Sequence, residues 1–173
     1  NLNVYGFAAV SGTLAIEKST KSVTLADASH VTVDMLSLGG TNLNGFAGVN
    51  GGYDASGVLN SSATGLSLSG VTFGLVLMSD QADASRKWTT LQATAANVSF
   101  VGMGSDLTVS ATNVSIAINQ SKANASVVDY SLKSGSTTER NTALSVATGP
   151  GASLALTLEG AKGQLMQASG LLN

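Results

Sequence analysis

Apolar and small polar residues alternate along this chain, and the alternation changes phase in mid-segment. Three stretches show it most clearly: Leu66–Leu77, Leu91–Val101 and Leu107–Ile118. In the third stretch the apolar residues occupy odd positions up to Ala111 and even positions from Val114 onward. Because successive side chains of a strand point to opposite faces of the sheet, a period of two predicts β-strands.

The phase change predicts a bulge or corner inside each of these strands. A shift of one residue sends every later side chain to the other face, so the apolar residues stay on one face only if the ladder is interrupted. The switches fall at Gly70-Val71, Ala96-Asn97 and Thr112-Asn113. Glycine and asparagine tolerate the positive φ that such corners often need.

The direction in which the corner recurs bears on the architecture. Meeting the same corner three times along the chain favours parallel stacking of equivalent segments, and therefore an irregular parallel β-solenoid. The spacing between the stretches is uneven, however, and Met103–Asp106 also suits a hairpin turn between antiparallel strands. An antiparallel β-sandwich or an open, trough-like sheet is therefore the alternative.

Segments rich in Gly, Ser, Asn and Asp separate the alternating stretches and predict loops. No change of composition marks a domain boundary, so residues 1–173 are expected to form a single all-β unit. The predicted loops are 48–65, 79–87, 120–125, 133–141 and 148–151.

The low charge of the chain argues against several classes of function. Charged residues make up 10% of the sequence, against roughly 25% in an ordinary soluble domain, and only one histidine is present. A chain with so few acids and bases is not expected to be an enzyme. It has no basic cluster for nucleic acid, no apolar run of about 18 residues for a transmembrane helix, and no cysteine for disulfides or thiolate metal sites.

Three aspartates are the candidates for calcium. Asp54 ends the sequence Gly51-Gly52-Tyr53-Asp54, a degenerate form of the nonapeptide that binds calcium in parallel β-rolls. Asp80 and Asp83 lie in the predicted loop 79–87. Calcium takes six to eight oxygen ligands, more than two carboxylates supply, so these side chains are expected to be solvated turn residues and no cofactor is predicted.

The single histidine, His30, lies near Asp27 and Asp34 in sequence and next to Ser29. Alternation places Asp34 on the same face as His30, but Asp27 falls out of register. Nucleophilic catalysis needs a nucleophile, a base and a group that orients the base, and no motif here supplies that arrangement. His30 is therefore expected to be an exposed strand residue.

Arg86-Lys87-Trp88 is the one place where cations adjoin an aromatic residue. An exposed tryptophan beside an arginine can stack on a sugar, so Trp88 and Arg86 are the candidates for ligand binding. The favoured interpretation is structural: Trp88 begins the next strand and fills the core or caps a sheet edge.

The two ends of the chain fit together as halves of one element. Leu165–Asn173 runs into Asn1–Phe7 with the alternation intact, as expected of a tandem repeat cut at its period. Several segments, in order, also resemble blocks of the long repeats of giant bacterial surface proteins of the adhesin type. They are Val4–Ser19, Phe46–Gly52, Gly65–Gly70, Phe100–Gly102, Leu107–Ala111 and Leu165–Gly170.

The resemblance implies a structural repeat of an exported bacterial filament, stalk or coat at the cell surface, which contributes to adhesion or surface architecture and whose partners are neighbouring copies end to end. An alternative is a module that binds carbohydrate or another cell surface, favoured if Trp88, Tyr53 and Phe46 are exposed together. A third hypothesis, an enzyme acting on polysaccharide, requires two carboxylates that face one groove.

Overall fold

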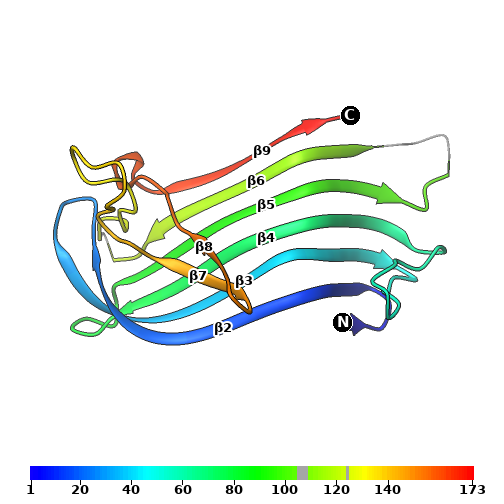
Figure 1. The fold of residues 1–173 in the computed structure, drawn as a ribbon, viewed down its shortest axis with the longest axis horizontal. Helices are drawn as coiled ribbons and strands as arrows, with labels where there is room; N and C mark the ends of the chain where they lie inside the picture. Colours follow the sequence, from blue (N-terminus) through cyan, green and yellow to red (C-terminus); the bar gives the residue numbers. More distant parts are fainter. Residues whose placement is uncertain (105–108, 124) are drawn as a thin grey trace.

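The computed structural model describes residues 1–104, 109–123 and 125–173. Its main feature is one antiparallel sheet of seven strands in the order β1-β2-β3-β4-β5-β6-β9 (Figure 1). A second, two-stranded sheet pairs β7 with β8. The elements are β1 (Leu2–Val4), β2 (Ala8–Thr24), β3 (His30–Val49), β4 (Thr64–Asp80), β5 (Lys87–Val101), β6 (Ser110–Ser121), β7 (Ser145–Gly149), β8 (Ala152–Ala155), the 3-10 turn η1 (Gly160–Lys162) and β9 (Leu165–Leu172).

The all-β class predicted from the alternation is confirmed, with 64% of the residues in strands. Every pair of strands among the described residues is antiparallel, and the main sheet is not closed. The parallel β-solenoid is therefore wrong, and the alternative of an open antiparallel sheet describes the fold. Each corner lies within its strand and not at a strand end, so antiparallel neighbours can still place their corners side by side. A corner that recurs along the chain thus does not distinguish parallel from antiparallel packing.

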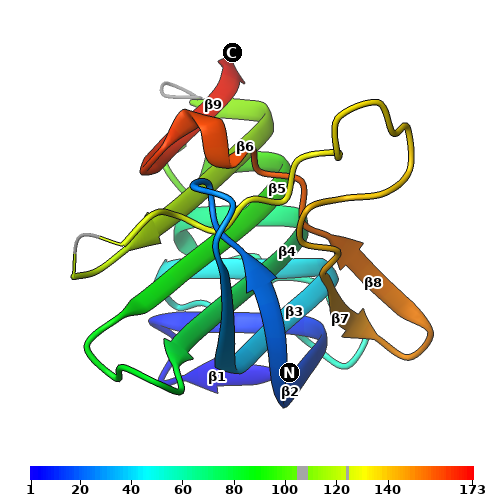
Figure 2. The same cartoon turned by 90° about the vertical axis from the view of Figure 1, so that its left-hand side faces the viewer.

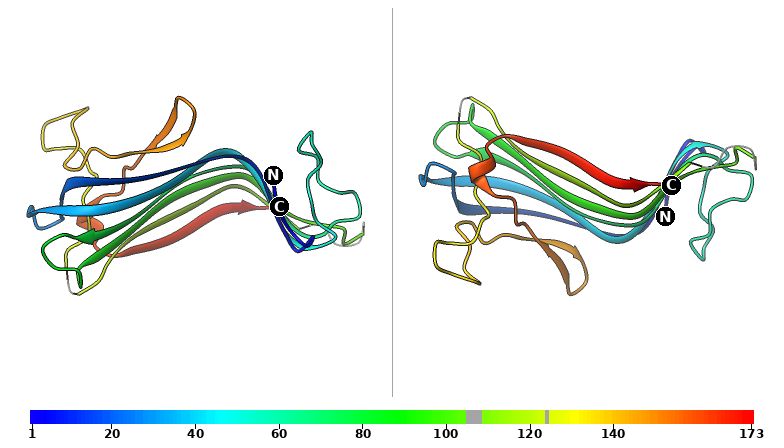
Figure 3. Two further views of the ribbon diagram at one scale, coloured as in Figure 1. Left: turned by 90° about the horizontal axis from the view of Figure 1, so that it is seen from below. Right: turned by 90° about the horizontal axis from the view of Figure 1, so that it is seen from above.

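The predicted corners form one line of irregular pairing across the sheet, here called the crease, where the strands bend together (Figure 3). Gly70, Ala96 and Asn113 have no partner in either flanking ladder. Gly70 and Asn113 have φ of 61° and 52°. The crease continues through Asn42 and Gly12, where β2 and β3 shift register. The corners expected at these three strands are therefore confirmed.

Most predicted loops coincide with the strand ends. Loop 48–65 connects β3 to β4, loop 79–87 connects β4 to β5, and loop 148–151 joins β7 to β8. The predicted loop 120–125 follows β6, but its residue 124 lies outside the described residues. Leu107, where the third alternating stretch starts, and the second half of the turn at Met103–Asp106 also lie outside them.

Residues 125–164, here called the covering segment, lie on one face of the sheet (Figure 2). They cover only the end of the sheet where β2 passes into β3, and they form the main core there (Figure 3). The largest fully buried side chains of this core are Trp88 of β5 and Tyr130 of the covering segment. The Tyr130 hydroxyl lies 2.9 Å from the hydroxyl of Thr90, which donates to Asn119 Oδ1 at 3.3 Å. This polar group is thus satisfied inside the core.

A second, smaller core lies at the opposite end of the sheet. Phe46 packs there with Ala9 and Ala63, and Tyr53 and Leu59 of the β3–β4 loop pack against this group. Between the two cores the sheet is a single layer, which leaves much of its surface exposed (Figure 3).

Candidate assembly surface

The face of the sheet opposite the covering segment, here called the bare face, is apolar in its middle and polar toward the covered end, where Lys18, Asp34 and Lys87 lie. Val33 and Met35 point into the core, so the alternate side chain of Leu36 points the other way, beside its partner Leu77. Leu36 and Leu77 are 36% and 41% exposed. Because a large exposed apolar area on a protein usually marks an interaction site, the bare face is the first component of the candidate site.

One cross-strand row on the bare face contains an apolar residue from each of the six long strands. The strand registers place its members directly opposite one another across every pair from β2 to β9. The row is Ile16, Leu38, Leu75, Leu91, Ile118 and Met166. Its two end members, Ile16 and Met166, are 71% and 70% exposed, because β1 does not reach Ile16 and Met166 lies on the edge strand β9.

An apolar hollow of about 310 Å³ lies where the crease passes between β2, β3 and β4. Val10, Leu14, Leu43, Val71 and Phe73 line it, together with Leu68. The change of phase at the crease produces this hollow, since it keeps apolar side chains on the same side before and after the bend.

Two open edges complete the candidate site. On one side, β1 pairs with residues 8–10 of β2, and Asp129 and Thr142 bond to the backbone of Thr24, which leaves residues 11–23 without a strand partner among the described residues on that side. On the other side, β9 is the last strand of the sheet, and all but the first of its residues are exposed. Unpaired N–H and C=O groups on an edge strand are ready to pair with another strand, and β9 carries neither charge nor proline to prevent it.

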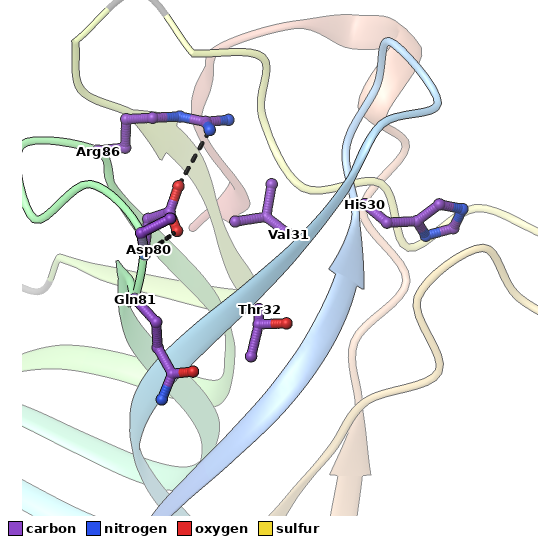
Figure 4. Close-up of a pocket in the computed structure, with 7 residues that line it drawn as sticks. His30, Val31, Thr32, Asp80, Gln81 and Arg86 are labelled. Carbon is purple, nitrogen blue, oxygen red and sulfur yellow. Dashed lines mark hydrogen bonds and ion pairs between the residues drawn. The ribbon is translucent and has the colours of Figure 1, made fainter.

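A polar hollow of about 490 Å³ lies at the covered end, beside the β4–β5 loop. Asp80 is buried there and forms an ion pair with Arg86 at 3.0 Å, while its other oxygen accepts from the backbone N–H of Ala82 at 2.8 Å (Figure 4). His30 points away from this pair (Figure 4). The hollow is lined by a single carboxylate, already engaged, whereas hydrolysis of a glycoside by the usual route requires two.

The calcium candidates are not gathered into one site. Asp54 lies in the β3–β4 loop, at the end of the sheet opposite Asp80 and Asp83 (Figure 1). Asp54 Oδ1 accepts from the backbone N–H groups of Ser56 and Val58, and Asp83 Oδ1 accepts from the N–H and hydroxyl of Ser85. Residues 1–104, 109–123 and 125–173 contain no group of three or more His, Asp or Glu side chains arranged to hold a metal ion.

The ligand-binding candidates Trp88 and Arg86 do come together, but Trp88 is buried and Arg86 is partly exposed. Trp88 is 1% exposed, and its Nε1–H donates to the carbonyl of Ser126 at 2.8 Å. The Arg86 guanidinium lies 5.3 Å from the centre of the indole ring. Trp88 therefore has the structural position that the favoured interpretation gave it, and its ring is not available for stacking on a sugar.

The residues around His30 have separate partners. His30 is exposed, and its Nδ1 lies 3.2 Å from the hydroxyl of Thr24. Hydrogen bonds from Ser29, and a further one from Ser126, hold the pKa of Asp27 below its usual value. Asp34 accepts instead from Thr20 and from Gln81, across the neighbouring strands.

Comparisons with protein-family models, with curated proteins and with solved structures found no match to this chain. No helix among the described residues is long and apolar enough to cross a membrane. Ile16 and Met166 are not among the site residues predicted from the sequence, which are charged and aromatic. No local sequence signal marks these two residues, because their exposure depends on the order of the strands in the sheet.

Proposed function

We propose that this chain is a structural repeat of an exported bacterial surface filament, stalk or coat, and that it contributes to adhesion or to cell-surface architecture. The observation that carries the proposal is the open sheet, which has two unpaired edges and one bare apolar face. In a monomeric protein such edges and faces promote aggregation, whereas in an assembly neighbouring copies cover them. The resemblance of Val4–Ser19 and later blocks to repeats of giant surface proteins supports the same role and a location outside the cell.

The role proposed is non-catalytic. The polar hollow at the covered end offers Asp80 already paired with Arg86, and the neighbouring His30 points away from it (Figure 4). The burial of Trp88 and Phe46 also favours a structural repeat over a carbohydrate-binding module, because aromatic rings must be exposed to stack on sugars.

Sedimentation velocity and electron microscopy of the purified chain test this proposal. The expected result is association that increases with protein concentration and produces linear assemblies, since two different edges joined head to tail generate open chains of copies. A chain that stays strictly monomeric at high concentration would contradict it. Sequencing of the gene around this segment provides a second test, in which further copies of the Val4-Tyr5-Gly6-Phe7 block are expected.

A further inference from the structure

We propose that copies of this chain join edge to edge, with β9 of one copy paired antiparallel to residues 12–19 of β2 in the next copy. The inference rests on the proposed function and identifies the surface through which the copies associate. The partner is a second copy of the same chain, for three reasons: strand direction, the position of β1, and the match between the two faces.

The direction of the strands permits the pairing without any rotation of the second copy. β2, β3, β4, β5, β6 and β9 are six strands, each antiparallel to the next, so β9 runs opposite to β2. A copy shifted sideways along the sheet therefore brings its β2 beside β9 in the antiparallel arrangement that every other pair already has. An odd number of strands would instead have made the two edges parallel.

The short strand β1 marks the line that the incoming strand follows. It lies on the outer edge of β2 with Leu2 opposite Val10, and it runs in the same direction as β9. Both termini lie at the same end of the sheet, on opposite edges (Figure 1). The C-terminal end of β9 in one copy thus points toward the start of β1 in the next, so β9 and β1 together complete a strand comparable to β5 or β6.

The two faces match when odd-numbered residues of both strands lie opposite each other. Val23 of β2 points into the covered core, and Leu165 of β9 lies opposite Asn119, which donates to Val128 of the covering segment. Odd positions of both strands therefore point to the covered side. The register that keeps this match and ends beside β1 places Gln167 opposite Glu17.

This register also continues the apolar row of the bare face. It sets Ala168 opposite Ile16 and brings Met166 to the diagonal position, within reach across an antiparallel pair. Ile16 and Met166, 71% and 70% exposed, then cover each other. In the proposed register Leu172 lies opposite Gly12, and Asn173 meets Asn1 of the next copy opposite Ser11, so one of these two terminal residues bulges out of the pairing. A register two residues closer to β1 would also set Leu172 opposite Val10, the position that Leu2 already occupies.

Disulfide cross-linking tests the pairing, and the absence of native cysteine makes the result unambiguous. The double variant Glu17→Cys/Gln167→Cys is expected to form a ladder of disulfide-linked oligomers on mild oxidation. The bond cannot form within one copy, because the two edges are five strand spacings apart, about 24 Å, while bridged cysteines have Cα atoms less than about 7 Å apart. In the control, Lys18→Cys/Gln167→Cys, the thiols point to opposite faces and the ladder should be lost.

A substitution at the edge provides a second readout. Ile16→Lys is expected to suppress association seen by sedimentation, because it places charge in the joined edge, whereas Val58→Lys, at a 60% exposed loop position, should leave association unchanged. If the wild-type chain associates but both cysteine pairs cross-link equally, or neither does, the edge pairing is overturned and the proposed structural role is kept. If the wild-type chain does not associate at all, both are overturned.

Discussion

Gly70 lies where β4 crosses the crease, in a backbone conformation that favours glycine. Its φ is 61°, and a Cβ added there would lie 2.8 Å from the Cβ of Ala96 on the neighbouring strand. We expect Gly70→Ala to lower the free energy of unfolding by about 1–3 kcal/mol, measured by urea denaturation. Gly45→Ala is the matched control, because a Cβ there meets nothing closer than 3.8 Å, and its effect should stay within about 0.5 kcal/mol. Equal losses in both variants would contradict the strain assigned to Gly70.

Asp129 of the covering segment makes stability depend on acid pH. Partial burial by itself raises the pKa of this carboxyl, but hydrogen bonds from Gly160, Ser131 and Asn141 outweigh it and hold the pKa below the usual 3.8. A group whose pKa is lower in the folded state stabilises the protein above its unfolded pKa, and that contribution is lost as the pH falls through the folded value.

The variant Asp129→Asn tests this contribution. At pH 7 it is expected to unfold about 1–3 kcal/mol more easily, the usual cost of losing hydrogen bonds to a charged group. Its free energy of unfolding should also decrease less than that of the wild type as the pH falls below about 4, because the titrating carboxyl is gone. Urea denaturation at several pH values measures both effects, and parallel pH profiles for the two proteins would argue against the role given to Asp129.

At the scale of elements, protection from hydrogen exchange should differ between strands of the same sheet. Residues 31–37 of β3 lie beneath the covering segment, whereas β9 has an exposed edge and almost no buried side chain. Hydrogen exchange followed by mass spectrometry should therefore show slow exchange in the first segment and fast exchange in Leu165–Leu172 of dilute protein. Exchange of β9 should slow at concentrations where copies associate. Equal protection of β9 at all concentrations would count against its use as a docking edge.

The sequence predicts the strands and their corners, but not the direction of pairing or the edges of the sheet. Alternation gave the strands and the corners at Gly70, Ala96 and Asn113, because both depend on residues adjacent in the chain. The direction of pairing could not be obtained, since a corner inside a strand looks alike from either end. The edges could not be predicted either, because the position of β9 at the end of the described sheet depends on the order of all its strands.

The candidate residues divide in the same way. Local chemistry identified Asp54 and Asp83 as turn residues, and their carboxylates do bond to neighbouring N–H groups. The exposure of Ile16 and Met166 depends on which strands are last in the sheet, and no local pattern of residues records that order.

At the scale of the whole molecule, two copies fused directly, Asn173 to Asn1, should behave as one extended sheet. We expect the fused pair to unfold at a higher urea concentration than a single copy, because the joined edges bury backbone groups and the side chains of Ile16 and Met166. The same fusion with Ile16→Lys in both copies is the control and should lose most of the gain. An unchanged urea midpoint for the unmodified fusion would show that the two copies fold independently of each other.

The crease has a mechanical consequence for such an array. Each copy adds six strands, so one repeat should advance the assembly by about 29 Å, a period that electron microscopy can measure. The crease crosses the six long strands β2, β3, β4, β5, β6 and β9 and would therefore run unbroken along the axis of the assembly. A strip of paper folded lengthwise resists bending far better than a flat one, and a sheet one layer thick gains rigidity in the same way. The glycines and asparagines that allow the bend would thus make a single-layer assembly resist bending along its long axis.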